Sequence, residues 1–280
     1  MDTSVEPESR PTNILRIALL HLAPRLGDLE YNCQLVETAA STAAALGAEW
    51  VMTPELCLCG YQFPHRIGTA WVAPHPDPWM ERVRRVAARL RITMFLSHPE
   101  RDRHTDKLYN TVFVIAADGA IIGAQRKVHV IPGAEAWATP GDTVVPVRVP
   151  PVLVGILVCA DAYTPALAGR LQAQGAQLLV SSAAWGPWPH GPDGAWEQRT
   201  LETGLPLFVC NRTGADQTLS FTEAESVVVK DGQRLLAFRA PHSTLLLLDW
   251  DLQAQTLVRQ ARRRIELQER GAEGVVIPTS

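Results

Sequence analysis

Three side chains of different chemistry each follow a predicted strand: the carboxylate of Glu55, the amine of Lys127 and the thiol of Cys159. A thiol can attack a carbon bonded to nitrogen, and a carboxylate can take the thiol proton and later give it to departing ammonia. An ammonium group can stabilise the negative charge that forms on oxygen. Together these residue types predict cleavage of a carbon–nitrogen bond through a thioester, provided that the fold brings them into one crevice.

The segment around Cys159 has the pattern of a strand, a turn and a helix. Residues 152–158 are rich in branched aliphatic side chains, which is typical of a strand buried on both faces. Pro165 suits the first turn of a helix over residues 164–174. Free N–H groups near a helix N-terminus favour a thiolate, and the N–H of Ala160 could hold an oxyanion. Taken alone, such a cysteine is more often an inert buried thiol.

Glu55 and Lys127 are predicted to lie at comparable positions. The strand over residues 48–53 stops at Pro54, and Glu55 follows at once. A hairpin over residues 110–128 turns at Asp118-Gly119 and places Lys127 near the end of its second strand. In layered α/β sheets, residues beyond the carboxyl ends of strands collect in one crevice, so we expect these two side chains to meet Cys159.

The remaining pattern alternates strands with helices at both ends of the chain and has hairpins in the middle. This order favours an α/β layered fold over a barrel or a dinucleotide-binding domain. Further strands are predicted at residues 14–21, 92–97, 143–149, 177–182, 207–210, 225–230, 233–238 and 243–250, and further helices at 29–46, 79–90, 195–203 and 253–268.

Composition narrows the class of protein. The 280 residues, 46% of them apolar, can form one large core, and a net charge of -3 without a basic block argues against nucleic acid as a partner. No apolar run is long enough to span a membrane, and residues 1–13 form a polar tail without the apolar core of a signal peptide. Five scattered cysteines, an odd number, favour a reducing cytoplasm over a disulfide framework.

Several longer motifs occur in a fixed order. They are TPELCLCGY around Glu55, QRKVHV around Lys127, GAEAWATPGD containing Glu135, GILVCADAYTP around Cys159, GAQLLVSSAAW ending at Trp185, and WEQRTLETGLPLFVCNRTG. Each motif is weak alone, but in this order and spacing the chain resembles the nitrilase superfamily of carbon–nitrogen hydrolases over residues 14–251.

The resemblance implies a four-layer αββα sandwich over residues 14–262, between tails at 1–13 and 263–280. It implies a catalytic triad of Glu55, Lys127 and Cys159, with Glu135 as an auxiliary glutamate that orients Lys127 and the substrate amide. No metal or organic cofactor is expected. The substrate would be a small amide or nitrile, and the chain would form a homodimer or a larger homo-oligomer. The residues expected to contact substrate are Tyr61, Trp137, Ala160 and Trp185, with Trp188 as a further candidate for the pocket wall.

Departures from the family pattern bear on the substrate. Classical nitrilases tend to follow the cysteine with Trp-Glu, whereas Ala160-Asp161 follows it here, which favours amides over nitriles. Carbamoylases usually place an arginine just beyond that aspartate, and Ala162-Tyr163 stand there instead, which argues against a carbamoyl amino acid.

Two other departures leave a catalytically silent binding or scaffold protein as an alternative. The family often has Pro-Glu beyond the nucleophile, where this chain has Pro165-Ala166, so a salt bridge that supports the turn is expected to be missing. The segment from Glu223 to Ser226 replaces the glycine and serine that often precede a strand in the family.

Two local patterns have competing interpretations. His129 lies two residues from Lys127 on the same strand face and could pair with Cys159, but we expect a structural hydrogen-bonding role. Cys57 and Cys59 have the appearance of metal ligands, yet no matching cysteine or histidine cluster follows, so a packing role is predicted.

Overall fold

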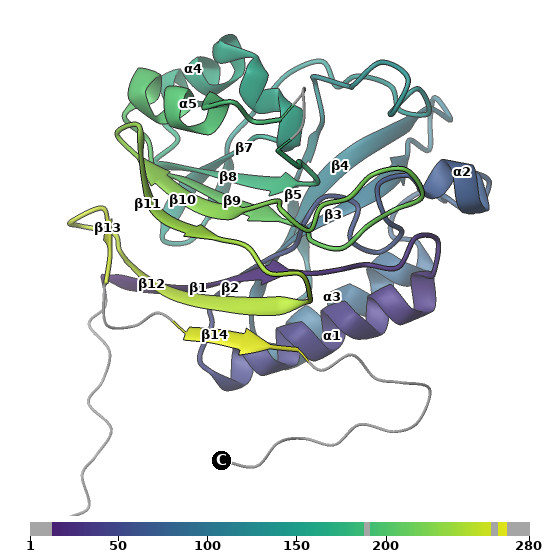
Figure 1. The fold of residues 1–280 in the computed structure, drawn as a ribbon, viewed down its shortest axis with the longest axis horizontal. Helices are drawn as coiled ribbons and strands as arrows, with labels where there is room; N and C mark the ends of the chain where they lie inside the picture. Colours follow the sequence, from purple (N-terminus) through teal and green to yellow (C-terminus); the bar gives the residue numbers. More distant parts are fainter. Residues whose placement is uncertain (1–12, 188–190, 259–262, 268–280) are drawn as a thin grey trace, which may run out of the picture.

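The computed structural model describes residues 13–187, 191–258 and 263–267, which form two β-sheets packed face to face between two layers of helices (Figure 1). The first sheet has the strand order β13-β12-β1-β2-β3-β4-β5, with β14 also paired to β12. Its strands are β1 (Ile14–His21), β2 (Trp50–Met52), β3 (Thr93–Arg101), β4 (Leu108–Ile115), β5 (Ile121–Arg126), β12 (Thr244–Asp251), β13 (Thr256–Leu257) and β14 (Arg263–Glu266).

The second sheet has the order β11-β10-β9-β8-β7-β6. Its strands are β6 (Val147–Val149), β7 (Val152–Ile156), β8 (Leu178–Ala183), β9 (Leu207–Asn211), β10 (Ser226–Lys230) and β11 (Gln233–Phe238). Within each sheet three neighbours run parallel, β1-β2-β3 and β7-β8-β9, so their carboxyl ends share one edge.

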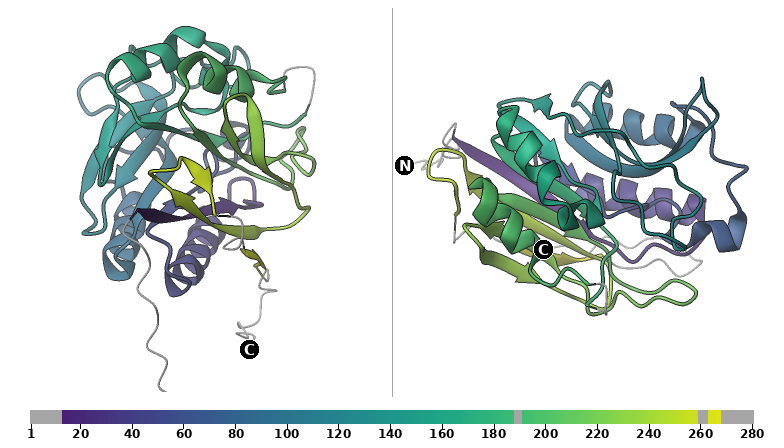
Figure 2. Two further views of the ribbon diagram at one scale, coloured as in Figure 1. Left: turned by 90° about the vertical axis from the view of Figure 1, so that its left-hand side faces the viewer. Right: turned by 90° about the horizontal axis from the view of Figure 1, so that it is seen from above.

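Helices cover the outer face of each sheet. Figure 1 shows α1 (Leu29–Ala45) and α3 (Pro78–Leu90) against the first sheet, and α4 (Pro165–Ala173) and α5 (Ala195–Thr203) against the second, while the short α2 (Phe63–Ile67) lies at one end. The views in Figure 2 show the same layers from two further directions. No helix in the described ranges is both long and apolar enough to cross a bilayer.

Three apolar layers hold the sandwich together. Alternate residues of β1, such as Ile17 and Leu19, face β7 residues Val154 and Ile156 between the sheets. The opposite face of β1 packs on α1, and the outer face of the second sheet packs on α4 and α5. Period-two burial along the strands and period-3.6 burial along the helices therefore confirm the predicted four-layer αββα sandwich.

The predicted helix over residues 253–268 is wrong. The structure has strands β13 and β14 there, and Ile265 and Leu267 pack on the apolar cluster beneath α1, which is the two-residue period of a strand. Residues 259–262 and 268 lie outside the described residues. Because β14 pairs with β12, the folded part extends beyond the predicted boundary at residue 262. The predicted tail at 1–13 lies outside the described residues except for Asn13.

Candidate active site

Cys159 lies at a strained turn between β7 and α4. Its φ of 48° is in the left-handed region, which costs a non-glycine residue about 1 kcal/mol. The buried carboxylate of Asp161 holds this turn by accepting hydrogen bonds from the N–H groups of Val158 at 2.9 Å, Val128 at 3.0 Å and His129 at 2.7 Å. These bonds tie the cysteine turn to the chain that leaves β5, so the strain is maintained by the surrounding structure.

Arg199 of α5 supports the same turn from the other side. Its Nη1 donates to the carbonyl oxygen of Ala162 at 2.7 Å, and its Nε lies 2.8 Å from Oε2 of Glu202 on its own helix. The position of Ala166 supplies no carboxylate. We expected a salt bridge that supports the cysteine turn to be missing. Arg199 supports this turn instead, and its own ionic partner, Glu202, lies one turn further along α5.

Glu55, Lys127 and Glu135 meet in one fully buried cluster. Nζ of Lys127 lies 2.7 Å from Oε1 of Glu55 and 2.8 Å from Oε1 of Glu135. Asn110 on β4 donates through Nδ2 to the same two oxygens, at 2.7 and 2.8 Å. The second oxygens of the carboxylates accept from backbone N–H groups, Ala184 for Glu55 at 3.1 Å and Ile131 for Glu135 at 2.8 Å.

The charges of this cluster shift the pKa values of its members. Burial lowers the pKa of Lys127, but the charges of Glu135 and Glu55 outweigh burial and hold that pKa well above its usual value. Burial raises the pKa of Glu55, and the charge of Glu135 adds to the rise while Lys127 opposes it. Lys127 therefore stays charged, and Glu55 becomes a stronger base than an exposed glutamate.

The Cys159 thiol lies within interaction range of the Glu55 carboxylate, whose ionised form it favours, and of the backbone of Ala184. It is only 4% exposed. Burial, together with the charge of Glu55, raises the pKa of Cys159 well above its usual value, and the opposing effect of Lys127 does not compensate. Burial of the sulfur therefore opposes the thiolate-favouring effect that we expected from the nearby N–H groups.

The carboxyl ends of β2, β7 and β8 place these groups. The N–H of Glu55 donates to the carbonyl oxygen of Ala183 at 3.2 Å, which links the end of β2 to the end of β8. Sequence reasoning predicted the meeting of Glu55, Lys127, Cys159 and Glu135 but missed Asn110. The available signal was a polar side chain in an otherwise apolar strand, at a position that the structure buries completely.

The residues predicted to contact substrate surround this cluster. The Tyr61 ring centroid lies 5.9 Å from Nζ of Lys127, and Trp137 packs edge-on against Phe63 in the same apolar group as Tyr61. Ala160 follows the cysteine in its turn and is buried, and Trp185 shares an apolar cluster with Cys159. Trp188 lies outside the described residues.

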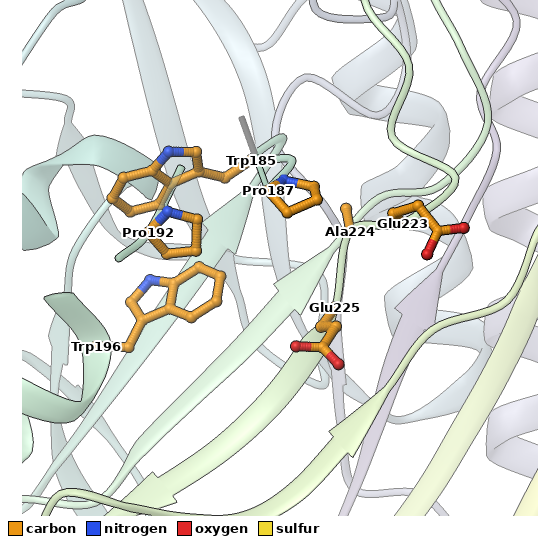
Figure 3. A pocket seen from close by; sticks show the side chains of 7 residues that line it. All are labelled: Trp185, Pro187, Pro192, Trp196, Glu223, Ala224 and Glu225. Atoms are coloured by element: carbon orange, nitrogen blue, oxygen red, sulfur yellow. The ribbon is translucent and has the colours of Figure 1, made fainter. Parts of the chain in front are cut away.

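A small pocket opens beyond Trp185 (Figure 3). Trp185 and Trp196 form one side with ring centroids 5.4 Å apart, and the loop from Glu223 to Glu225 lies opposite them. Glu225 pairs with Arg234 and Glu223 with Arg239, both on or beside β11. The acidic segment from Glu223 to Glu225 therefore contacts the β10–β11 hairpin through two ion pairs.

The two ambiguous patterns have structural roles. Nδ1 of His129 lies 3.0 Å from Oγ1 of Thr164, which confirms the predicted hydrogen-bonding role beside the cysteine turn. Cys57 and Cys59 are buried in separate apolar clusters, as predicted. In the part of the chain that the structure describes, no group of histidine, cysteine and acidic residues has the arrangement of a metal site.

The glutamate, lysine and cysteine lie buried together where the two packed sheets meet, which is the arrangement that the resemblance to carbon–nitrogen hydrolases led us to expect. The family model described as carbon-nitrogen hydrolase matches residues 16–260, and the chain belongs to this family, the nitrilase superfamily.

Relatives support the same assignment. An amidase from Nesterenkonia sp. AN1, solved with the acetamide moiety of fluoroacetamide added covalently at its active site cysteine, is 26% identical with a TM-score of 0.77, covering 87% of this chain and 93% of that one. A hydrolase of Mycobacterium tuberculosis is 35% identical over 197 residues, covering 67% of this chain and 66% of that protein. A probable nitrilase of Schizosaccharomyces pombe is 24% identical over 225 residues, covering 79% and 83%.

Proposed function

We propose that this protein hydrolyses a small carboxamide to a carboxylate and ammonia, with Cys159 as nucleophile. The observation that carries the proposal is the contact of the Cys159 thiol with a buried Glu55 that Lys127 and Glu135 flank. Because the thiol rests protonated, Glu55 takes its proton as sulfur attacks the carbonyl carbon. The charge on oxygen is stabilised by Lys127 and by the N–H of Ala160.

Collapse of this intermediate breaks the carbon–nitrogen bond and leaves a thioester on Cys159. The proton held by Glu55 passes to the leaving nitrogen, which departs as ammonia. Water then attacks the thioester with Glu55 as base, and the carboxylate leaves with the thiol restored. Glu135 holds Lys127 in place, and Tyr61, Trp137 and Trp185 surround the acyl group. No metal or organic cofactor takes part in this scheme.

Cys159→Ala tests the proposal directly. We expect the variant to release no ammonia from amides that the wild type consumes, and we expect intact-mass measurement to detect an acyl adduct on wild-type Cys159 with slow substrates. Equal ammonia release by the two proteins would contradict the proposal. That outcome would favour the silent binding protein, an alternative weakened by the ion pairs of Glu223 and Glu225 and by the contact of Arg199 with the turn near Ala166.

A nitrilase is the second candidate, since a relative bears that name. The amide preference is supported by Ala160-Asp161 after the nucleophile and by the amidase among the solved relatives. Assaying one carbon skeleton as amide and as nitrile separates the two reactions. A consumed nitrile with an inert amide would overturn the preference.

Assembly and location complete the proposal. We expect a homodimer, which sedimentation or light scattering would measure, and a cytoplasmic location. All five cysteines are free and buried, which is consistent with a reducing compartment.

A further inference from the structure

Asn110 occupies the centre of the buried charge cluster. Its Nδ2 has two protons, and the two hydrogen bonds go to the same Oε1 atoms that accept from Lys127. Two carboxylate oxygens and two nitrogen donors therefore form a closed ring of hydrogen bonds. The backbone N–H of Lys127 also donates to the carbonyl oxygen of Asn110 at 2.7 Å, which fixes both donors to one piece of sheet.

The amide of Asn110 can face the cluster in one orientation only. A flipped amide would direct its oxygen at the Oε1 atoms of Glu55 and Glu135, where acceptor would meet acceptor. In the observed orientation, Oδ1 is buried and has no hydrogen-bond partner within the described residues. An unsatisfied buried acceptor costs stability. The observed orientation therefore keeps the two hydrogen bonds of the NH₂ group at the expense of leaving Oδ1 without one.

The cluster holds two carboxylates for one ammonium group. Two carboxylates that share a site tend to retain one proton, because both cannot ionise without repulsion. Asn110 adds two donors without adding charge and so stabilises the ionised form of both. The titratable groups that face Glu55 are Lys127 after β5, Glu135 and Tyr61 from loops, Cys159 after β7 and Arg212 after β9.

We propose that Asn110 is a positioning residue, whose amide stabilises the Glu55 carboxylate and holds Glu55 and Glu135 aligned on Lys127. The inference rests on the proposed function, in which Glu55 must accept the thiol proton. It adds to the three reactive residues a neutral side chain that acts through Glu55.

Asn110→Leu removes both donors and keeps a side chain of similar volume. We expect kcat to fall about 100-fold because the base loses its alignment, with KM changing much less. The acid limb of kcat/KM is expected to move up by about one pH unit, because the carboxylate pair retains a proton to higher pH. Asn110→Ser, which keeps a single donor, should show a smaller shift in the same direction.

Asn32→Leu is the matched control. Asn32 is equally buried, and its Nδ2 donates to the carbonyl oxygens of Arg25 and Leu58 instead of to carboxylates. This variant should lose stability and leave the pH profile of the folded enzyme in place. An unmoved acid limb in both Asn110 variants, with activity losses that follow the folded fraction as in Asn32→Leu, would overturn the inference.

A second readout separates this inference from the proposed function. The rate of Cys159 alkylation by iodoacetamide, followed by peptide mass against pH, reports proton removal from the thiol without turnover. If the wild type releases ammonia from no amide or nitrile, the proposed function fails, whereas a shifted alkylation limb in Asn110→Leu still supports the role of Asn110. An alkylation limb that does not move counts against the inference whatever the turnover.

Discussion

Two groups of charged side chains that lie completely buried within the described residues are built on opposite principles. In the first, Arg212 and Asp216 form a 1:1 pair with Nη1 and Oδ1 2.8 Å apart and no exposed side-chain surface. Asp216 also accepts from the N–H of Gln62 at 2.8 Å, and Arg212 donates to the carbonyl oxygens of Thr213 and Pro24. Each charge has a partner of opposite sign and further hydrogen bonds, so the charges of this group balance.

The second group is unbalanced. Glu55 and Glu135 share one ammonium group, that of Lys127, and a neutral amide from Asn110. The surplus carboxylate, Glu55, is in contact with the thiol of Cys159, and burial of this thiol favours its protonated form. The comparison indicates that removing one member of the balanced pair would leave an uncompensated buried charge, whereas the surplus carboxylate of the unbalanced group can accept a proton, as the proposed reaction requires.

Glu55→Gln tests the unbalanced group and should have the largest effect. The isostere cannot accept the thiol proton, so kcat should fall about 1,000-fold. Lys127 keeps its pair with Glu135, so we expect only a small change in melting temperature. Ammonia release and thermal unfolding measure the two quantities. More than a tenth of wild-type activity in this variant would remove Glu55 from the role of base.

Asp216→Asn makes the same chemical change in the balanced group. It leaves the Arg212 charge buried without a counter-ion, which should lower the free energy of unfolding by about 3–5 kcal/mol. Urea denaturation measures this loss, and activity should fall only with the folded fraction. The control is Asp106→Asn, since Asp106 pairs with Arg101 at the surface and is 83% exposed. An equal loss of unfolding free energy in both variants would show that burial of the Arg212–Asp216 pair does not increase the cost of breaking it.

Much of this arrangement could be predicted from sequence because strand ends are local features. Pro54 stops β2 directly before Glu55, and Asp118-Gly119 sets the hairpin that brings Lys127 to its place. Strand direction then places these carboxyl ends on one edge of each sheet, and packing of the two sheets brings Glu55 and Lys127 to Cys159.

Other features depend on contacts between distant segments and could not be predicted. In the sequence, Asn110 is only a polar residue in an apolar strand, and its role becomes visible when the fold places Glu55 and Glu135 against it. The protonated state of Cys159 depends on burial by Trp185 and its neighbours. The place of β7 next to the edge strand β6 could not be predicted either, because sheet order is set by long-range pairing.

The smallest predicted effect concerns a third kind of buried titratable group, one that is neutral. Both ring nitrogens of His75 are buried and have no hydrogen-bond partner in the described part of the chain. Nδ1 lies 3.7 Å from Oδ2 of Asp77, and the ring packs 4.3 Å from that of Phe113. Burial, with the neighbouring His98, lowers the pKa of His75 to about 4. An unfolded histidine titrates near 6.5, so stability is complete above that pH and is lost as pH falls towards 4.

His75→Phe removes both unsatisfied nitrogens and the titration while keeping the aromatic contact. We expect the free energy of unfolding to rise by about 1 kcal/mol at pH 7 and by about 2 kcal/mol more at pH 5. Urea denaturation at both pH values measures the difference, with the exposed His104→Gln as control. Equal gains at pH 5 and pH 7 would mean that folding does not lower the pKa of His75, so that the folded protein carries a protonated His75 at pH 5. His75 would then form a charged pair with Asp77, and it would belong with the balanced buried pairs instead of the neutral buried groups.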